Sequence, residues 1–273
     1  MKITTDLLMI TPDIAMEMLS SNTGNRKLNP KHVNFLVGCM TRGEWEYNGD
    51  DIKFDAHGKL IDGQHRLEAI AKSGIPQLCG VKRGLPVGSF MTLDTNELPR
   101  STAQVLQLSG EKDATALAAA VNLIHDITSG HSVMGSVERR SPAYLKSFIE
   151  KHPGIRDSVT FTGRLMTVSS MLGRGKPAGL HYLFSLVDEA EANAYFSDLE
   201  SGIFRSTTDP VYLLRQKLIQ NMSMRDKMSR TTIIAMAIKC WNFRIQGKHL
   251  TRLQYSSIEG FPVIEGKPKR AYA

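Results

Sequence analysis

The chain has 273 residues, of which 41% are hydrophobic and 22% charged, a composition typical of globular proteins with a buried core. This composition excludes disorder along the whole chain, and its apolar runs are shorter than the roughly 20 residues of a membrane-spanning helix. The first residues hold no apolar stretch of signal-peptide length and include an acid, so we expect no signal peptide. Three scattered cysteines, Cys39, Cys79 and Cys240, favour a cytoplasmic protein over a disulfide scaffold.

The formal net charge of +7 is unevenly distributed along the chain. Residues 1–110 carry 12 basic and 12 acidic side chains, whereas residues 201–273 carry 13 basic and 4 acidic ones. A basic excess confined to one part of a chain indicates a surface that faces nucleic acid or another polyanion. The alternative is a basic face that contacts only solvent.

The N-terminal part predicts short helices mixed with short strands. Helices are expected to begin where a capping residue precedes proline, at Thr11-Pro12 and at Asn29-Pro30. Gly43 marks the end of the second helix. Alternating or compact apolar runs bounded by turn residues predict strands. These strands span residues 51–55, 60–61, 76–81 and 90–94.

The remainder of the chain predicts helices and no strand. Apolar residues recur there at helical spacing, and Asp209-Pro210 repeats the combination of cap and proline. The expected helices span residues 114–127, 142–151, 179–199, 209–222 and 230–246. The sequence therefore predicts an α+β fold with two domains, a mixed domain over residues 1–110 and an all-helical domain over residues 111–273.

The segment that carries the most chemistry is Asp62-Gly63-Gln64-His65-Arg66-Leu67-Glu68-Ala69, which joins a predicted strand to a predicted helix. Gly63 permits a sharp turn and close approach of a ligand. The free N–H groups at the helix start favour an anion, and Arg66 can bind phosphate oxygens through two donors. His65 can transfer a proton, and Asp62 or Glu68 can orient it or hold a metal ion. The alternative is an ordinary turn with a surface salt bridge.

The same segment resembles the DGQHR variant of the phosphate-binding box in the ParB/sulfiredoxin superfamily. The resemblance covers about residues 5–110, and the hairpin that precedes the box agrees with it. It implies a small mixed sheet, a nucleoside triphosphate such as CTP or ATP with Mg²⁺, and a DNA-associated role of the phage or plasmid type. Gly63, Gln64, His65 and Arg66 would then hold the phosphates, and Asp62 the Mg²⁺.

Two flanking segments resemble other parts of the family's nucleotide pocket. Asn25-Arg26 lies in a region similar to the family's upstream N-x-R motif. Asp94-Thr95-Asn96 and Arg100 are similar to a weakened downstream box. Glu44 could supply a carboxylate to a reacting group, as in kinase members of the superfamily. The alternative is that neighbouring Trp45 fills the core while the glutamates are solvated.

The sequence departs from the family pattern inside the box. ParB proteins commonly have Glu-Arg-Arg where this chain has Gln64-His65-Arg66, so the identity of the base and any clamp behaviour stay open. The sulfiredoxin box holds a cysteine that is missing here, so reductase chemistry is not expected.

Basic residues of the C-terminal part are the candidates for DNA contact. They lie on two predicted helices and on the connection between them, without a helix-turn-helix signature, so we expect sequence-independent contacts with phosphates. The candidates are Arg215, Lys217, Arg225, Lys227, Arg230, Lys239, Arg244 and Lys248. A separate basic loop, Gly173-Arg174-Gly175-Lys176, lacks the strand and spacing of a P-loop and is at most another polyanion contact.

Three hypotheses of function follow. The first is a nucleotide-binding protein, either an NTPase or a phosphotransferase, that works with DNA. The second is a non-enzymatic regulator or partition-type factor of a phage or plasmid, which could form a homo-oligomer. The third is a DNA nuclease or base-modification component, based on the acidic residues Asp50, Asp51, Asp55 and Asp62.

Overall fold

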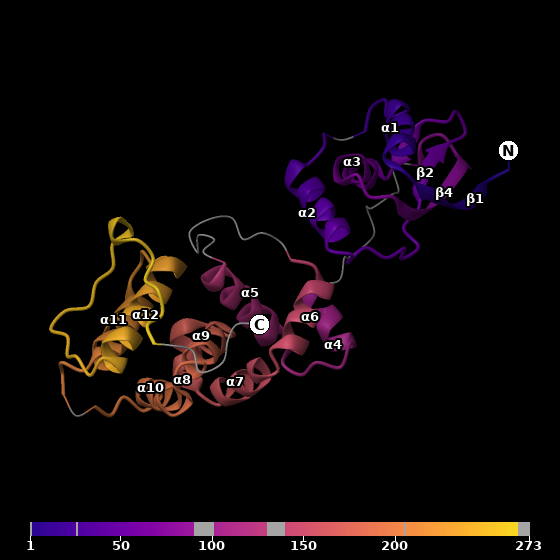
Figure 1. The fold of residues 1–273 in the computed structure, drawn as a ribbon. Coiled ribbons are helices and arrows are strands. Elements are labelled where there is room, and N and C mark those ends of the chain that lie inside the picture. The colour runs from indigo at the N-terminus through magenta and orange to yellow at the C-terminus, as the bar shows by residue number, and fades with distance from the viewer. Residues whose placement is uncertain (1, 26, 90–100, 130–139, 205, 267–273) are drawn as a thin grey trace. The chain divides into compact units, whose positions relative to one another are not determined.

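A computed structural model describes residues 2–25, 27–89, 101–129, 140–204 and 206–266, and these residues combine helices with one small sheet (Figure 1). The chain divides into two compact units. Residues 1–100 and 138–143 form the sheet unit, and residues 101–137 and 144–273 form the helical unit. Within the described ranges, no helix is both long and apolar enough to cross a bilayer.

The sheet unit has a four-stranded mixed sheet in the order β1-β4-β2-β3. Its outer pairs, β1 with β4 and β2 with β3, are antiparallel, whereas β2 and β4 are parallel. The strands are β1 (Thr4–Ile10), β2 (Ile52–Asp55), β3 (Leu60–Asp62) and β4 (Gln77–Leu85). The parallel pair requires a crossover, and a helix after β3 supplies it.

Three helices complete this unit: α1 (Pro12–Ser20), α2 (Pro30–Thr41) and α3 (Gln64–Ser73). The predicted starts of the first two are confirmed, since Thr11 and Asn29 cap them through their side chains and proline follows each cap. Helix α3 packs against both α1 and α2. The core beneath these helices includes Ile52, Phe54, Leu67, Ile70 and Val81, and Trp45 packs against it.

Strand β1 is unusual because six of its seven residues are exposed. Its residues Leu7 and Met9 lie opposite Gly80 and Leu78 of β4, and they leave more than half of their surface in solvent. The apolar run that begins the chain therefore forms an edge strand rather than a core strand. The predicted strand over residues 90–94 lies outside the described residues.

The helical unit begins with α4 (Thr102–Leu108), α5 (Ala114–Thr128), α6 (Pro142–Lys151, whose first two residues group with the sheet unit) and α7 (Gly154–Gly163). It continues with α8 (Met166–Leu172), α9 (Lys176–Ser185), α10 (Glu189–Ser201), α11 (Pro210–Ser223) and α12 (Arg230–Ile245). The described part of this unit contains no strand, as the sequence predicts. A short 3₁₀ turn, η2 (Ser257–Glu259), follows the last helix.

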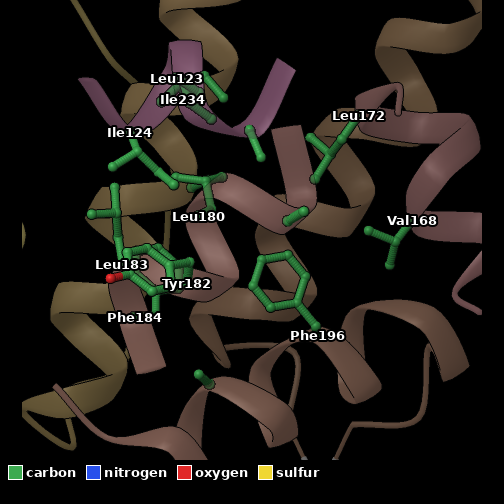
Figure 2. Close-up of a cluster of buried hydrophobic side chains, with 14 of the residues drawn as sticks. Leu123, Ile124, Val168, Leu172, Leu180, Tyr182, Leu183, Phe184, Phe196 and Ile234 are labelled. Carbon is green, nitrogen blue, oxygen red and sulfur yellow. The ribbon is translucent and has the colours of Figure 1, made fainter. Parts of the chain in front are cut away.

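The core of the helical unit forms where α5, α8, α9, α10 and α12 meet (Figure 2). Leu180, Leu183 and Phe184 of α9 lie at its centre, because α9 is buried on nearly all sides. Phe184 stacks on Trp241 of α12 with ring centroids 4.3 Å apart. Such stacking adds specific geometry to the large apolar area that two aromatic rings remove from water.

The predicted helix over residues 179–199 is wrong, because two helices occupy this range. Helix α9 ends at Ser185, and Asp188 then starts α10 by accepting a hydrogen bond from the backbone N–H of Glu191. An aspartate inside an apolar pattern thus acts as a cap. Helices α7 and α8 were not predicted. The side chain of the N-cap residue caps neither start, and α8 has only 7 residues.

Candidate functional site

The candidate site is the start of α3, which follows the β2–β3 hairpin directly in the chain. Asp55 closes the hairpin turn, since its carboxylate accepts hydrogen bonds from the backbone N–H groups of His57 and Lys59 at 2.9 Å. After β3, Gly63 adopts a left-handed conformation with φ of 98°, and α3 begins at the next residue. A Cβ on residue 63 would lie 3.1–3.2 Å from Ile52, so both the turn and the close packing require glycine.

The N-cap residue of α3 is Gly63, which has no side chain with which to cap the helix. The first N–H groups of a helix have no partner within the helix, and they carry its positive dipole end. Most other long helices of the protein are capped by a side chain, as Asn29 caps α2 and Ser229 caps α12. The start of α3 therefore offers the kind of backbone surface on which proteins bind phosphate.

A loop from the end of α1 is fixed beside this helix start by polar contacts. The Asn22 amide donates to the Gln64 Oε1 atom at 3.1 Å. The Asn25 amide donates both to Asn22 and to the Leu60 carbonyl, at 2.7 Å each. The Ser21 carbonyl accepts from the Leu60 N–H at 3.1 Å. The loop over residues 21–25 thus has a defined position against β3 and α3.

His65 fixes the continuation of this loop. Its Nε2 atom accepts a hydrogen bond of 3.0 Å from the backbone N–H of Asn29, the residue that caps α2. The His65 side chain is buried and lies edge-on to the His32 ring. An Nε2 atom that accepts a hydrogen bond cannot at the same time receive a proton from a substrate. In this arrangement the Nε2 atom of His65 has a structural role, and a role of His65 in proton transfer stays a prediction.

Asp62 is held by cations of the protein itself. Its carboxylate lies 2.9 Å from the Lys53 amine and 3.4 Å from the Arg66 guanidinium, and it also accepts from the Gly63 N–H. Within the described ranges, no group of three His, Cys, Asp or Glu side chains could hold a metal ion. The Asp62 carboxylate is thus already paired with two cations of the protein, and its role in binding Mg²⁺ stays a prediction.

Arg66 connects α3 to the residues just before the hairpin. Its guanidinium donates to the backbone carbonyls of Asp50 and of Asp51, the latter at 2.9 Å, immediately before β2. Its side chain is only 15% exposed. Arg66 was predicted to bind phosphate, but in this arrangement it joins α3 to the start of β2.

The remaining predicted catalytic carboxylates lie apart from the start of α3. Glu68 is half-buried in the second turn of α3. Glu44 is bound by both nitrogens of the Arg42 fork and by the Ser141 hydroxyl. Burial raises the pKa of Glu44, but these hydrogen bonds outweigh it and hold the pKa below its usual range. A carboxylate that is charged and bound in this way is a poor general base.

The acidic residues that suggested a nuclease are engaged in structure. Asp51 is buried, lies 3.1 Å from the Lys82 amine and accepts from the Tyr47 hydroxyl at 2.9 Å. Asp55 closes the hairpin turn, as described above. Asp50 accepts from the Asn48 amide at 3.0 Å in an exposed turn. These carboxylates do not converge on one point.

A cation is available beside the loop over residues 21–25. The Lys59 amine lies against Gly24, at 3.3 Å from where a Cβ on that glycine would be. Lys59 makes no ion pair with any residue that the structure describes. No role was predicted for Lys59, which lies in the hairpin turn shortly before the box. Three predicted pocket residues, Arg26, Asp94 and Arg100, lie outside the described residues.

Most of the predicted DNA-contacting residues make contacts inside the helical unit. Arg244 is paired with Glu191 and Asp198 of α10 and is 17% exposed. Lys239 binds Glu259 at 2.7 Å, and Lys227 donates to the carbonyls at the end of α11.

Two further members of the set also contact the protein. Arg215 donates to the Leu199 carbonyl at 3.1 Å, and Arg230 lies 3.7 Å from Asp126. Lys217, Arg225 and Lys248 make no ion pair with the residues that the structure describes. These three are the members of the set without an ion pair in the described ranges, and contact of the whole set with DNA stays a prediction.

The chain was compared with protein-family models, curated proteins and solved structures. None of the three comparisons gives a match.

Proposed function

We propose that the sheet unit belongs to the ParB/sulfiredoxin-like superfamily and binds the phosphates of a nucleoside triphosphate, CTP or ATP, at the start of α3. The observation that carries this proposal is the turn at Gly63 into the start of α3, where the cap residue has no side chain, with the loop over residues 21–25 bonded beside it. The hairpin that leads into the helix agrees with the order of elements in the superfamily.

The site supports binding better than turnover. The polar side chains that could act as acid, base or metal ligand, His65 and Asp62 among them, are engaged in holding the loop and the hairpin. Binding needs only N–H donors and a nearby cation, and Lys59 supplies the cation. We therefore favour a nucleotide-binding or nucleotide-sensing protein over an NTPase, a phosphotransferase or a nuclease.

Calorimetric titration of the full chain with CTP, ATP and GTP tests this proposal. We expect one of the three to bind, and Lys59→Gln to weaken that binding about tenfold or more, since a charge-assisted hydrogen bond contributes about 1.5–3 kcal/mol. Lys72→Gln is the matched control, because Lys72 lies in the last turn of α3, at the opposite end of the helix from the proposed site. Absence of binding by the wild-type chain, or equal binding by Lys59→Gln, contradicts the proposal.

Arg66→Ala is a weaker test than Lys59→Gln. Arg66 donates to two carbonyls before β2, so its removal disturbs the hairpin in addition to any contact with phosphate. Lys59 has no such contact in the described part of the chain, so its substitution changes charge with little effect on the fold.

We further propose that the helical unit contacts DNA through its unpaired basic residues. The excess of basic residues over residues 201–273 supports this role. Replacing Lys217, Arg225 and Lys248 together by glutamine should weaken binding of any duplex and reduce the salt dependence by up to about three counterions. The control replaces Lys2, Lys31 and Lys72, which removes the same charge from the sheet unit. Equal losses of DNA affinity in both variants would show that only net charge matters, and would contradict a DNA contact through these three residues.

A further inference from the structure

The helical unit contains a cleft of about 770 Å³ that the proposed function does not use. Its walls are the connection between α4 and α5, the end of α7, the start of α8 and the loop before α9. All of these segments belong to one unit. A concave site of this volume is in the range of pockets that bind small molecules.

Two cations line this cleft and are free to contact a ligand. Lys112 and Arg174 are exposed, and neither forms an ion pair with a residue that the structure describes. The cleft also contains two carboxylates. That of Glu111 is bound by the guanidinium of Arg156, through the Nε donor at 2.9 Å and through a second nitrogen. With Arg156 pairing Glu111, Asp113 is the remaining acid of the lining against Lys112 and Arg174, so the cleft together with Arg156 carries three basic and two acidic groups.

Arg174 is held in the cleft by the glycine that follows it. Gly175 has φ of 85°, and a Cβ there would lie 2.5 Å from the Ala119 Cβ and 2.8 Å from the Ala116 carbonyl oxygen. The loop before α9 therefore packs directly on the first turns of α5. This contact brings Arg174 close to the segment that carries Lys112, and glycine is required for it.

Backbone donors add to these two side chains. Helices α5 and α9 both begin at the wall of the cleft, and no side chain caps either start. The neighbouring start of α8 differs, since Glu200 accepts from the N–H groups of Thr167 and Val168 at 3.1 and 2.8 Å. The protein thus supplies its own carboxylate at the start of α8. Of the other two starts, that of α5 offers the N–H groups of its first residues, whereas Pro177 in the first turn of α9 has no N–H to donate.

We propose that this cleft binds a small phosphorylated molecule, with Lys112 and Arg174 as the residues that contact its phosphate. Met166, Val159 and Pro177 provide apolar walls for the remainder of the ligand. Phosphate on a DNA backbone has the same chemistry, but a concave site favours a small ligand over a duplex. This proposal concerns the helical unit alone and does not depend on the site at α3.

Pyrophosphate and ATP are the probes, and the methyl group of Met166 is the local reporter. We expect either probe to shift the Met166 signal of methyl-labelled protein in a saturable manner, while the signal of Met40 in the sheet-unit core stays unchanged. Arg174→Gln and Lys112→Gln should each raise the dissociation constant about tenfold. Arg164→Gln, an exposed position of the same unit, should leave it unchanged.

The outcomes separate the two sources of phosphate. A Met166 shift with duplex DNA but not with either small probe would overturn the proposal in favour of a DNA contact. An unchanged Met166 signal with all probes would overturn it altogether. Because Lys59→Gln affects only the site at α3, a retained Met166 shift in that variant shows that the two sites are independent.

Discussion

The two units use their buried polar groups in different ways. In the sheet unit, Gln64 and His65 are buried and bind an irregular loop and the start of α2. In the helical unit, His181 and Asn242 are buried and connect regular helices to each other or to the C-terminal segment. Similar chemistry thus positions a candidate site in one unit and stabilises packing in the other.

This difference predicts two kinds of response to mutation. Changes to polar groups of the sheet unit should alter the position of the loop over residues 21–29 and, with it, the affinity for a ligand. Changes inside the helical unit should alter the free energy of unfolding without a specific effect on the site at α3.

The largest expected effect is in the core of the helical unit. Trp241 is fully buried and stacked on Phe184, so Trp241→Ala should lower the free energy of unfolding of this unit by about 3–5 kcal/mol. Urea denaturation followed by circular dichroism measures this change in the free energy of unfolding. Ile258→Ala is the control, since Ile258 is 95% exposed and its truncation should have little effect. Similar losses of unfolding free energy in both variants would contradict the placement of Trp241 in the core.

A smaller effect is expected at Gly80 of β4. A Cβ there would overlap the Asp51 carboxylate and lie 2.6 Å from the Tyr47 hydroxyl, so Gly80→Ala should cost about 1–3 kcal/mol. The loss should be strongly non-additive with Asp51→Ala, because the second change removes the obstacle. Additive losses in urea denaturation would show that Asp51 does not lie against Gly80.

His65→Leu tests the polar anchoring in the sheet unit. The change leaves the Asn29 N–H without its acceptor, which should cost about 1–3 kcal/mol. Hydrogen exchange should become faster in the backbone amides of residues 21–25 and 27–29. His57→Leu is the matched control, because His57 is exposed in the hairpin turn. Unchanged exchange in His65→Leu would contradict the anchoring role.

The smallest predicted effect is a dependence on pH in the helical unit. His181 bonds Ser158 and Asn193, and burial lowers its pKa more than the Asn193 contact raises it, so the pKa lies below the ordinary value of about 6.5. The unfolded chain therefore takes up a proton first as pH falls.

Stability that is fully present above about pH 6.5 should decline below it, by at most about 1.4 kcal/mol for each pH unit. The decline ends near the lower, folded-state pKa. His181→Gln should show a shallower decline between pH 6.5 and 5.5, and an identical slope in both proteins would contradict a neutral, buried His181. His152, whose pKa is also lowered by burial, accounts for part of the remaining slope.

Local signals in the sequence predicted many of the elements. Three helices begin as expected where Thr11, Asn29 or Asp209 precedes proline, because the cap and the fixed φ of proline act within a few residues. The hairpin and the turn at Gly63 were predicted for the same reason.

What could not be predicted depends on residues far apart in the sequence. His65 turns inward because Asn29, 36 positions away, offers it an N–H. Arg244 is not free for DNA because Glu191 and Asp198 lie on a neighbouring helix, about 50 positions away. Residue type identified both as candidates for function, but only the packing of distant segments shows which partners they meet.

The most direct test of the central claim is the response of the first backbone amides of α3 to a nucleotide. We expect CTP or ATP to shift the ¹⁵N–¹H signals of Gly63, Gln64 and His65 in a saturable manner, and Lys59→Gln to weaken this response. Signals of α3 that stay unchanged at millimolar nucleotide, while the wild-type chain is folded, would contradict a phosphate site at this helix start.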